Sequence, residues 1–381
     1  MGRRRVAILG ATGSIGTQAL DVARRLPEAI EVVALAAHRS AERVAELAHK
    51  FKVRLLAMTD PEAAGRLKAL LNEGVRVLAG EEALEALVVE ADPDIVVVAT
   101  AGLSALKATL LALGSGKRVA LATKEILVEA GRLVMKEARK GELVPVDSEH
   151  SAAFQLLRAE GGAIRKLVIT ASGGPFRSAP NEALEGVTPE EALRHPTWRM
   201  GVKVTVDSAT LMNKALEVVE AHHLFGLPPE RIEVVVHPQS IVHALVELTD
   251  GAVMAHMALP DMRLPIQYAL THPGRLPSPV PLLDLTKVGR LEFEPVDYER
   301  FPCARLGHEA LRAGGGKALV MSAADEVAVE AFLEGRIKFT DIARVVMEAM
   351  DSLDLPEPES PEEALEAHKI ARAKALELMG G

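Results

Sequence analysis

The first 150 residues alternate short β-branched segments with amphipathic stretches of helical period, and no other feature restricts the fold as much. Strands separated by helices at this spacing form right-handed β–α–β units, so the strands pair in parallel within one sheet. Helices cover both faces of such a sheet. The fold class is therefore predicted to be α/β. The expected strands are Val6–Leu9, Glu31–Ala37, Val53–Met58, Val75–Leu78, Ile95–Ala99, Arg118–Ala122 and Leu143–Val146.

Polar or glycine-rich clusters follow several of these strands. They occupy residues 10–16, 38–40, 100–102, 123–125 and 147–149. In an open parallel sheet, ligands bind in the crevice beyond the carboxyl ends of the strands. We therefore expect these clusters to converge at one edge of the sheet.

From about Gly161 the pattern changes to longer strand candidates, with Asp250-Gly251 as a strong hairpin signal. This change predicts a second α/β domain with a mixed sheet. Its expected strands are Lys166–Thr170, Val202–Val206, Arg231–Val236, Ile241–Leu248 and Ala252–Ala258.

The stretch from Pro260 to Pro302 contains eight of the 22 prolines, which favours a stiff connection over regular helix. After Leu306 the apolar residues recur at helical spacing, with Thr340 and Ser360 as candidate N-caps. We therefore predict four segments. They are an N-terminal Rossmann-like domain (1–147), a second α/β domain (148–275), a linker (276–305) and a C-terminal helical bundle domain (306–381).

The composition of the chain excludes several classes of protein and of binding partner. The net charge of −9 gives no general attraction for nucleic acid or an anionic membrane, so a small-molecule partner is expected. Cys303 is the only cysteine, which excludes an intrachain disulfide and a thiolate metal cluster, and suits a reducing cytoplasm. The most apolar stretch, residues 95–106, is too short to cross a bilayer.

Gly10, Gly13 and Gly16 follow the first strand and open a helix. In this context glycines let the backbone approach a pyrophosphate at the helix N-terminus, whereas the simpler interpretation is an ordinary tight turn. The second strand ends in His38-Arg39-Ser40 instead of the acidic residue that binds an NAD ribose. This favours NADP over NAD, although Arg39 can also be a solvated residue before the next helix.

Asp147 and Glu149 lie two residues apart at a strand end, so in extended backbone their side chains point to the same side. Two carboxylates without cysteine favour a hard cation such as Mg²⁺ or Mn²⁺. Acidic residues at this position are more often helix caps. The motif alone therefore leaves both interpretations open.

Residues 206–217 are expected to run from strand into helix, where Asn213 and Glu217 share one face and Lys214 adjoins them. These groups suit a phosphorylated polyol and its metal ion, or form a plain surface ion pair. Ser172-Gly173-Gly174 follows another strand and can present a hydroxyl and N–H groups to an anion. The single tryptophan, Trp198, lies in a segment bounded by Pro196 and Gly201, which fits a substrate-covering lid or a core position.

Together these motifs resemble the 1-deoxy-D-xylulose 5-phosphate reductoisomerase family over essentially the whole chain. The matching strings, in the family's order, are GATGSIG, LATKE, PVDSEHSA, ASGGPF, HPTWRMG, VDSATLMNKALE and HPQS. The resemblance implies an NADPH-dependent oxidoreductase that isomerises and reduces 1-deoxy-D-xylulose 5-phosphate to 2-C-methyl-D-erythritol 4-phosphate in the non-mevalonate isoprenoid pathway. It also implies a homodimer that uses Mg²⁺ or Mn²⁺, with Co²⁺ as a further option.

The resemblance carries functional roles onto individual positions. The implied cofactor contacts are Thr12, Gly13, Ser14, Ile15, Ala37, His38, Arg39, Thr123, Glu125 and Gly201. The implied metal ligands are Asp147, Glu149 and Glu217, which together with Lys124 are also the implied catalytic residues. The implied substrate contacts are Lys124, Ser148, Ser172, His195, Ser208, Asn213, Lys214 and Glu217. Trp198 and Met200 belong to the implied lid, residues 195–201.

The chain departs from the family pattern on the cofactor side. The family usually has Gly-Lys-Asn where this chain has Ala37-His38-Arg39, and Asn where it has Thr123. Two alternative functions are an acylating semialdehyde dehydrogenase and an NADP-binding sensor or scaffold. A semialdehyde dehydrogenase of the acylating kind needs a catalytic cysteine, and Cys303 lies outside the motifs. An NADP-binding sensor or scaffold has no need for Asp147, Glu149 and Glu217 to converge.

Overall fold

The computed structural model describes residues 2–160, 164–198 and 200–380. The chain divides into two compact units that are not contiguous in sequence. Unit 1 comprises Met1–Ile126, Val134–Ser151 and Asp261–Pro281, and unit 2 comprises Leu127–Leu133, Ala152–Pro260 and Leu282–Gly381. No helix of the described residues is long and apolar enough to cross a membrane.

Unit 1 is built on a seven-stranded sheet with the order β4-β3-β2-β1-β5-β6-β7. All of its strand pairs are parallel. The strands are β1 (Arg4–Leu9), β2 (Ile30–Ala37), β3 (Leu55–Met58), β4 (Arg76–Ala79), β5 (Ile95–Val98), β6 (Arg118–Leu121) and β7 (Glu142–Pro145). The strand order reverses at β1, so the loop after β1 lies at the point where such sheets bind ligands. The predicted Rossmann-like parallel sheet is confirmed.

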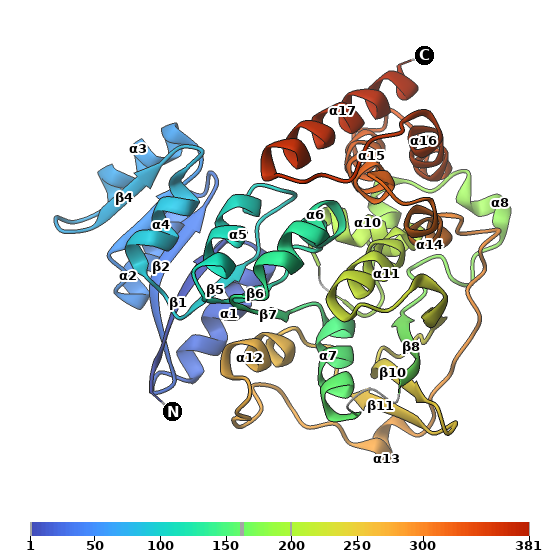
Figure 1. The fold of residues 1–381 in the computed structure, drawn as a ribbon, viewed down its shortest axis with the longest axis horizontal. Coiled ribbons are helices and arrows are strands. Elements are labelled where there is room, and N and C mark those ends of the chain that lie inside the picture. The colour runs from blue at the N-terminus through green and yellow to red at the C-terminus, as the bar shows by residue number, and fades with distance from the viewer. Residues whose placement is uncertain (1, 161–163, 199, 381) are drawn as a thin grey trace. The chain divides into compact units, whose positions relative to one another are not determined.

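Helices connect these strands, as the alternation of segments predicts. They are α1 (Ser14–Arg25), α2 (Ala41–Phe51), α3 (Pro61–Leu70), α4 (Ala83–Ala91), α5 (Leu106–Gly114) and α6 (Lys124–Glu137), and α7 (Ser148–Glu160) follows the last strand. Figure 1 shows α3 beside β4, the edge strand of the sheet.

The proline-rich stretch is not free of helix, contrary to expectation. It contains α12 (Arg263–Thr271), which belongs to unit 1 and packs against α1, β6 and β7. Pro265 lies in the first turn of α12, where a proline removes no intrahelical hydrogen bond. Arg263 of this helix bonds Asp21 of α1, and Arg118 of β6 donates to the carbonyl of Ala269.

Unit 2 contains a four-stranded sheet with the order β11-β10-β8-β9. Its strands are β8 (Ile164–Ala171), β9 (Ile232–Val236), β10 (Val242–Leu248) and β11 (Val253–Met257). The β8–β9 pair is parallel and the other two pairs are antiparallel, so the predicted mixed sheet is confirmed. Gly251, in the hairpin between β10 and β11, has a φ of +88°.

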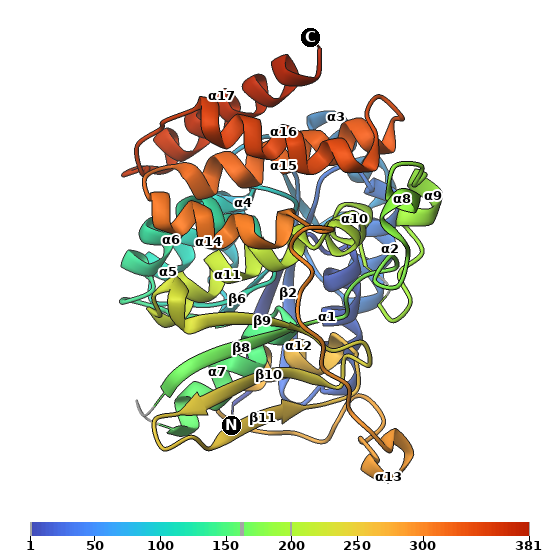
Figure 2. The same ribbon diagram turned by 90° about the vertical axis from the view of Figure 1, so that its right-hand side faces the viewer.

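Unit 2 also includes residues 127–133 of α6 and residues 152–160 of α7. Its other helices come later in the chain. They are α8 (Asn181–Leu184), α9 (Pro189–Ala192), α10 (Val202–Thr210), α11 (Met212–Phe225), α13 (Leu285–Val288), α14 (Cys303–Ala313), α15 (Lys317–Leu333), α16 (Phe339–Ser352) and α17 (Pro361–Met379), with a 3₁₀ turn at Pro229–Arg231. Figure 2 shows α11 and α14 between the sheet and α15–α17. The helical C-terminal region is thus confirmed, whereas the division into domains at residues 147, 275 and 305 stays a prediction.

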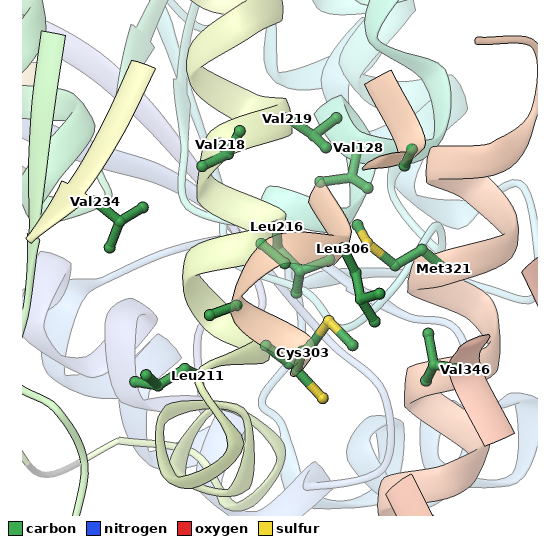
Figure 3. Close-up of a cluster of buried hydrophobic side chains, with 14 of the residues drawn as sticks. Val128, Leu211, Leu216, Val218, Val219, Val234, Cys303, Leu306, Met321 and Val346 are labelled. Atoms are coloured by element: carbon green, nitrogen blue, oxygen red, sulfur yellow. The ribbon is translucent and has the colours of Figure 1, made fainter. Parts of the chain in front are cut away.

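One buried apolar cluster joins α11 to the C-terminal helices. Leu216, Leu306 and Met321, from three different helices, meet in it (Figure 3). A Cβ on Gly307 of α14 would lie 2.1 Å from the carbonyl oxygen of Ala215, so glycine permits the close approach of α14 to α11. This packing fixes the position of α11, which carries three of the predicted site residues.

The strand expected at Val202–Val206 is wrong, because these residues form the start of α10. Valines that alternate with polar residues are typical of a half-buried strand. In the structure every residue from Thr205 to Thr210 is buried, because α10 packs against α11 and α15. The hydroxyls of Thr205 and Thr210 bond the carbonyls four residues earlier, which accommodates them in a helix. Ser360 does cap α17, whereas α16 begins at Phe339, one residue before the expected cap Thr340.

Candidate active site

Two positions after β1, Gly10 and Gly16, have no room for a side chain. A Cβ on Gly10, whose φ is +88°, would lie 2.1 Å from the carbonyl oxygen of Ala99, and one on Gly16 would lie 2.2 Å from that of Gly10. Gly13 is the N-cap of α1, and within the described chain no side chain caps this helix. The first N–H groups of α1 therefore suit an anion, and the predicted contacts Thr12, Gly13, Ser14 and Ile15 line this turn.

The end of β2 carries three of the predicted cofactor contacts, Ala37, His38 and Arg39. Ala37 is its last residue, and the Nδ1 atom of His38 lies 2.8 Å from the hydroxyl of Thr59. The guanidinium of Arg39 is 73% exposed and bonds Asp60, with Nε 3.3 Å from Oδ2. The N–H of Ala63 and then the Arg39 charge hold the pKa of Asp60 below its usual range. Arg39 thus presents a largely solvated cation beside the strand end.

Thr123 and Glu125 occupy the junction between β6 and α6. The Thr123 side chain is buried, and its hydroxyl donates to the carbonyl of Thr100 over 2.8 Å, linking two neighbouring strand ends. Glu125 is half-buried in the first turn of α6. Their predicted role as cofactor contacts stays a prediction, as does that of Gly201, which is the N-cap of α10 in unit 2.

Lys124 and Asp147 meet at the ends of the adjacent strands β6 and β7. Lys124 Nζ lies 3.0 Å from Asp147 Oδ2, and both side chains are almost fully buried, at 8% and 12% exposure. Two residues that are distant in sequence thus form one charged pair in unit 1, as the strand-end argument predicts.

Asp147 is also the N-cap of α7, so the helix-cap interpretation is confirmed for it. Its Oδ1 accepts hydrogen bonds from the N–H groups of Glu149 and His150. The argument that Asp147 and Glu149 share one side of an extended backbone is wrong, because Glu149 lies in the first turn of α7. The hydroxyl of Ser148 bonds the carboxylate of Glu149.

His150 is a residue of this site that sequence reasoning missed. Its side chain is fully buried, and its Nδ1 lies 2.9 Å from Oδ1 of Asp147. The signal was available, since a histidine three residues after an N-cap aspartate returns to that carboxylate on the same helical face.

In unit 2, α11 presents the predicted trio on one face. Lys214 Nζ lies 2.6 Å from Glu217 Oε2, and Asn213 donates to Glu217 Oε1. The side chains of Lys214 and Glu217 are 6% and 1% exposed, so the pair is buried and the surface ion pair interpretation is wrong. Leu211, with a φ of +60°, separates α10 from α11. This break places the end of α10 beside the first turn of α11.

His195 brings together the serines of two other segments. Its Nε2 lies 3.1 Å from the hydroxyl oxygens of both Ser172 and Ser208. Its Nδ1 accepts from the backbone N–H groups of Thr197 and Trp198, so Nε2 carries the proton. Burial and then the charge of Lys214 lower the pKa of His195 to about 4. The ring is therefore neutral at pH 7 and donates from Nε2.

The turn after β8 packs directly against α10. Gly174 has a φ of +69°, and a Cβ on it would lie 2.6 Å from the carbonyl oxygen of Ser208. The Gly174 N–H donates to the hydroxyl of Ser172 over 3.2 Å. Glycine at this position therefore allows Ser172 and Ser208 to approach the same imidazole.

The predicted lid, residues 195–201, is partly described. The ring of Trp198 is half-buried and meets that of His243 edge-on, with 6.1 Å between the centroids. Met200 is also half-buried, and Arg199 lies outside the described residues. A half-buried ring is compatible with a lid residue and with a core residue. The role of Trp198 therefore stays a prediction.

Comparison with known proteins decides the family. Three family models match the chain. They are described as 1-deoxy-D-xylulose 5-phosphate reductoisomerase (residues 6–131), its C-terminal domain (143–225) and DXP reductoisomerase C-terminal domain (257–374). The chain belongs to the 1-deoxy-D-xylulose 5-phosphate reductoisomerase family.

Similar proteins cover nearly all of the chain. The reductoisomerase of Moorella thermoacetica is 51% identical over 93% of this chain and 92% of its own length. That of Anaeromyxobacter dehalogenans is 47% identical over 99% and 97%. Two solved structures of the reductoisomerase family cover 99% of this chain. The enzyme of Zymomonas mobilis with NADPH is 42% identical over 99% of its own chain (TM-score 0.91), and a complex with NADPH, fosmidomycin and magnesium is 38% identical over 98% of its own chain (TM-score 0.93).

The semialdehyde dehydrogenase alternative is wrong. Cys303 is 1% exposed at the start of α14, and burial followed by the charges of Asp325 and Asp207 raises the pKa of its thiol. A buried thiol with a raised pKa is a poor nucleophile. Cys303 belongs to the apolar cluster drawn in Figure 3.

Proposed function

We propose that this chain converts 1-deoxy-D-xylulose 5-phosphate into 2-C-methyl-D-erythritol 4-phosphate, with NADPH and a divalent metal ion, in the non-mevalonate isoprenoid pathway. The observation that carries the proposal is the family match over nearly the whole length. The described geometry supports it, because the glycine turn after β1 in unit 1 suits a dinucleotide and the groups around His195 in unit 2 suit a phosphate. Solved relatives contain NADPH and magnesium.

The phosphate of the substrate is expected to bind at the cluster around His195. Ser172, Ser208 and the Nε2–H of His195 are donors at close range, and the Lys214 ammonium supplies positive charge. Asn213 adds an amide donor from the same helix face. The neutral imidazole donates a hydrogen bond and carries no charge, so the buried Lys214 alone supplies positive charge. Together they suit a phosphate group without giving the site an excess of positive charge.

Asp147, Glu149 and Glu217 are the proposed ligands of the metal ion. The donor set fits a hard divalent cation such as Mg²⁺ or Mn²⁺, because it consists of carboxylate oxygens. Asp147 and Glu217 each already face a cation, the ammonium of Lys124 and that of Lys214. When bound, the metal ion polarises the substrate carbonyl and eases loss of the adjacent hydroxyl proton.

The chain's own residues then position the reacting groups. Lys124 stabilises negative charge on the substrate oxygens, while the phosphate contacts hold the other end of the molecule. Breaking and re-forming a carbon–carbon bond, or a direct shift, gives a branched aldehyde. Hydride from NADPH reduces this aldehyde to the product alcohol. Trp198 and Met200 are proposed to help cover the substrate and exclude water.

The decisive experiment follows NADPH oxidation with 1-deoxy-D-xylulose 5-phosphate, with and without Mg²⁺ or Mn²⁺. We expect turnover that depends on the metal ion and that falls at least about a hundredfold in Glu217→Gln. Glu233→Gln, which alters an exposed carboxylate paired with Lys166, is the control and should keep wild-type turnover. Absence of metal-dependent turnover in the wild type would contradict the proposal.

We also propose a cytoplasmic homodimer. The family resemblance supports the dimer, and the single cysteine suits a reducing compartment. Light scattering coupled to size-exclusion chromatography should give twice the chain mass of 40.7 kDa. A monomer at micromolar concentration would contradict the dimer without affecting the proposed reaction.

A further inference from the structure

The segment after β2 lacks the lysine usual in the family, and the structure shows another cation beside it. Arg66 lies on the exposed side of α3, and its Nη2 donates to the carbonyl oxygen of Arg39 over 3.3 Å. Two guanidinium groups, from Arg39 and Arg66, therefore flank the same short segment. Sequence reasoning gave no role to Arg66, since it lies 27 residues further along the chain.

We propose that Arg66 is a specificity-determining residue that binds the 2′-phosphate of NADPH together with Arg39 and distinguishes NADPH from NADH. This inference rests on the proposed use of NADPH. A guanidinium is planar and donates two parallel hydrogen bonds to phosphate oxygens, so a pair of them suits a dianionic group. The 2′-phosphate is also the chemical difference between the two cofactors.

The backbone beside these guanidinium groups adds to the same site. Ser40 is the N-cap of α2, and no side chain caps this helix in the part of the chain that the structure describes. Its hydroxyl and the first N–H groups of α2 follow directly after Arg39. A helix start with positive partial charge, a hydroxyl and two guanidinium groups converge on one short segment of unit 1.

The carboxylate of Asp60 adds a negative charge beside these positively charged groups. Its carboxylate pairs with Arg39, and its other oxygen caps α3 by accepting from the N–H of Ala63 over 2.8 Å. A bound phosphate must compete with Asp60 for Arg39. Arg66 bonds a neutral carbonyl instead, so its charge is not offset by that contact.

The test measures the dissociation constants of NADPH and NADH, without substrate, by nicotinamide fluorescence or calorimetry. In Arg66→Ala we expect NADPH to bind about tenfold more weakly, which corresponds to about 1.4 kcal/mol, and NADH to bind as in the wild type. Arg66→Lys should recover part of the loss, because it keeps the charge without the planar fork. Arg76→Ala, which removes an exposed guanidinium paired with Glu90 in the same unit, is the control and should change neither constant.

A second variant tests the charge balance independently. Asp60→Asn keeps an N-cap for α3 but removes the carboxylate that competes for Arg39, so NADPH should bind more tightly. Equal weakening of both cofactors in Arg66→Ala, or no weakening of NADPH, would overturn the inference. Failure of the wild type to bind NADPH would instead contradict the proposed function.

Discussion

At the scale of single residues, His195 illustrates how the backbone sets the chemistry of a side chain. Two N–H groups directed at Nδ1 fix the tautomer, and burial keeps the ring neutral. A histidine next to a proposed phosphate site would ordinarily be treated as a cation. Here the positive charge comes from Lys214, and the imidazole contributes a directed donor.

Replacing His195 should therefore weaken substrate binding through a lost hydrogen bond. We expect His195→Ala to raise KM for the substrate by about tenfold to a hundredfold, in line with a hydrogen bond to a charged group. Steady-state kinetics at several substrate concentrations checks this. The matched control is His49→Ala, an exposed histidine on α2, and a similar change in KM there would contradict the assignment.

Two histidines with lowered pKa values, His195 and His223, predict how the stability of the fold depends on pH. Burial lowers the pKa of both His195 and His223 to about 4 from an ordinary value of 6.5. The unfolded chain takes up these protons at higher pH than the folded chain does, so their stabilisation is present above pH 6.5 and is lost as the pH falls toward 4.

Thermal unfolding between pH 7 and pH 4.5 measures this effect. His223→Asn removes one of the two groups and should reduce the decline of Tm over this interval relative to the wild type. An unchanged decline would show that His223 does not contribute to the pH dependence.

At the scale of elements, the sequence predicted the regular parts of the fold and missed those that depend on tertiary contact. The strands of both sheets follow from β-branched segments, and the Lys124–Asp147 pair follows from the order of parallel strand ends. The helix at Val202–Thr210 could not be predicted, because packing overrides the strand pattern of its side chains. The packing of α12 in unit 1 could not be predicted either. The prolines near α12 carry no information about contacts with elements that are distant in sequence.

The turn after β8 gives a prediction at this scale. Gly174→Ala places a methyl group 2.6 Å from the Ser208 carbonyl at a φ of +69°, so the turn must move away from α10. We expect a loss of at least about 1 kcal/mol in the free energy of unfolding and a raised KM for the substrate. Denaturant unfolding and kinetics test both effects. Gly186→Ala, where a Cβ meets open space, is the control and should leave both quantities unchanged.

At the scale of the whole molecule, the chain leaves unit 1 and returns to it. Asp261–Pro281 carries α12 back to α1, β6 and β7, so unit 1 is not one continuous segment. A fragment of residues 1–151 would expose the surface that Ile266 and Leu270 cover, since both are buried in unit 1. Such a fragment should bind the dye ANS and unfold with low cooperativity.

A fusion that adds residues 261–281 through a flexible linker should restore cooperative unfolding. Circular dichroism melts of the fragment and of the fusion compare the two. If the bare fragment melts as cooperatively as the fusion, α12 is not required for the stability of unit 1.

The scarcity of aromatic residues has a practical consequence. Trp198 is the only tryptophan of the chain, and it lies half-buried with its ring edge toward His243. Indole emission under selective excitation therefore reports on a single loop, the one whose N–H groups fix the tautomer of His195. The protein carries its own optical probe, so ligand binding can be timed by stopped-flow fluorescence without any label.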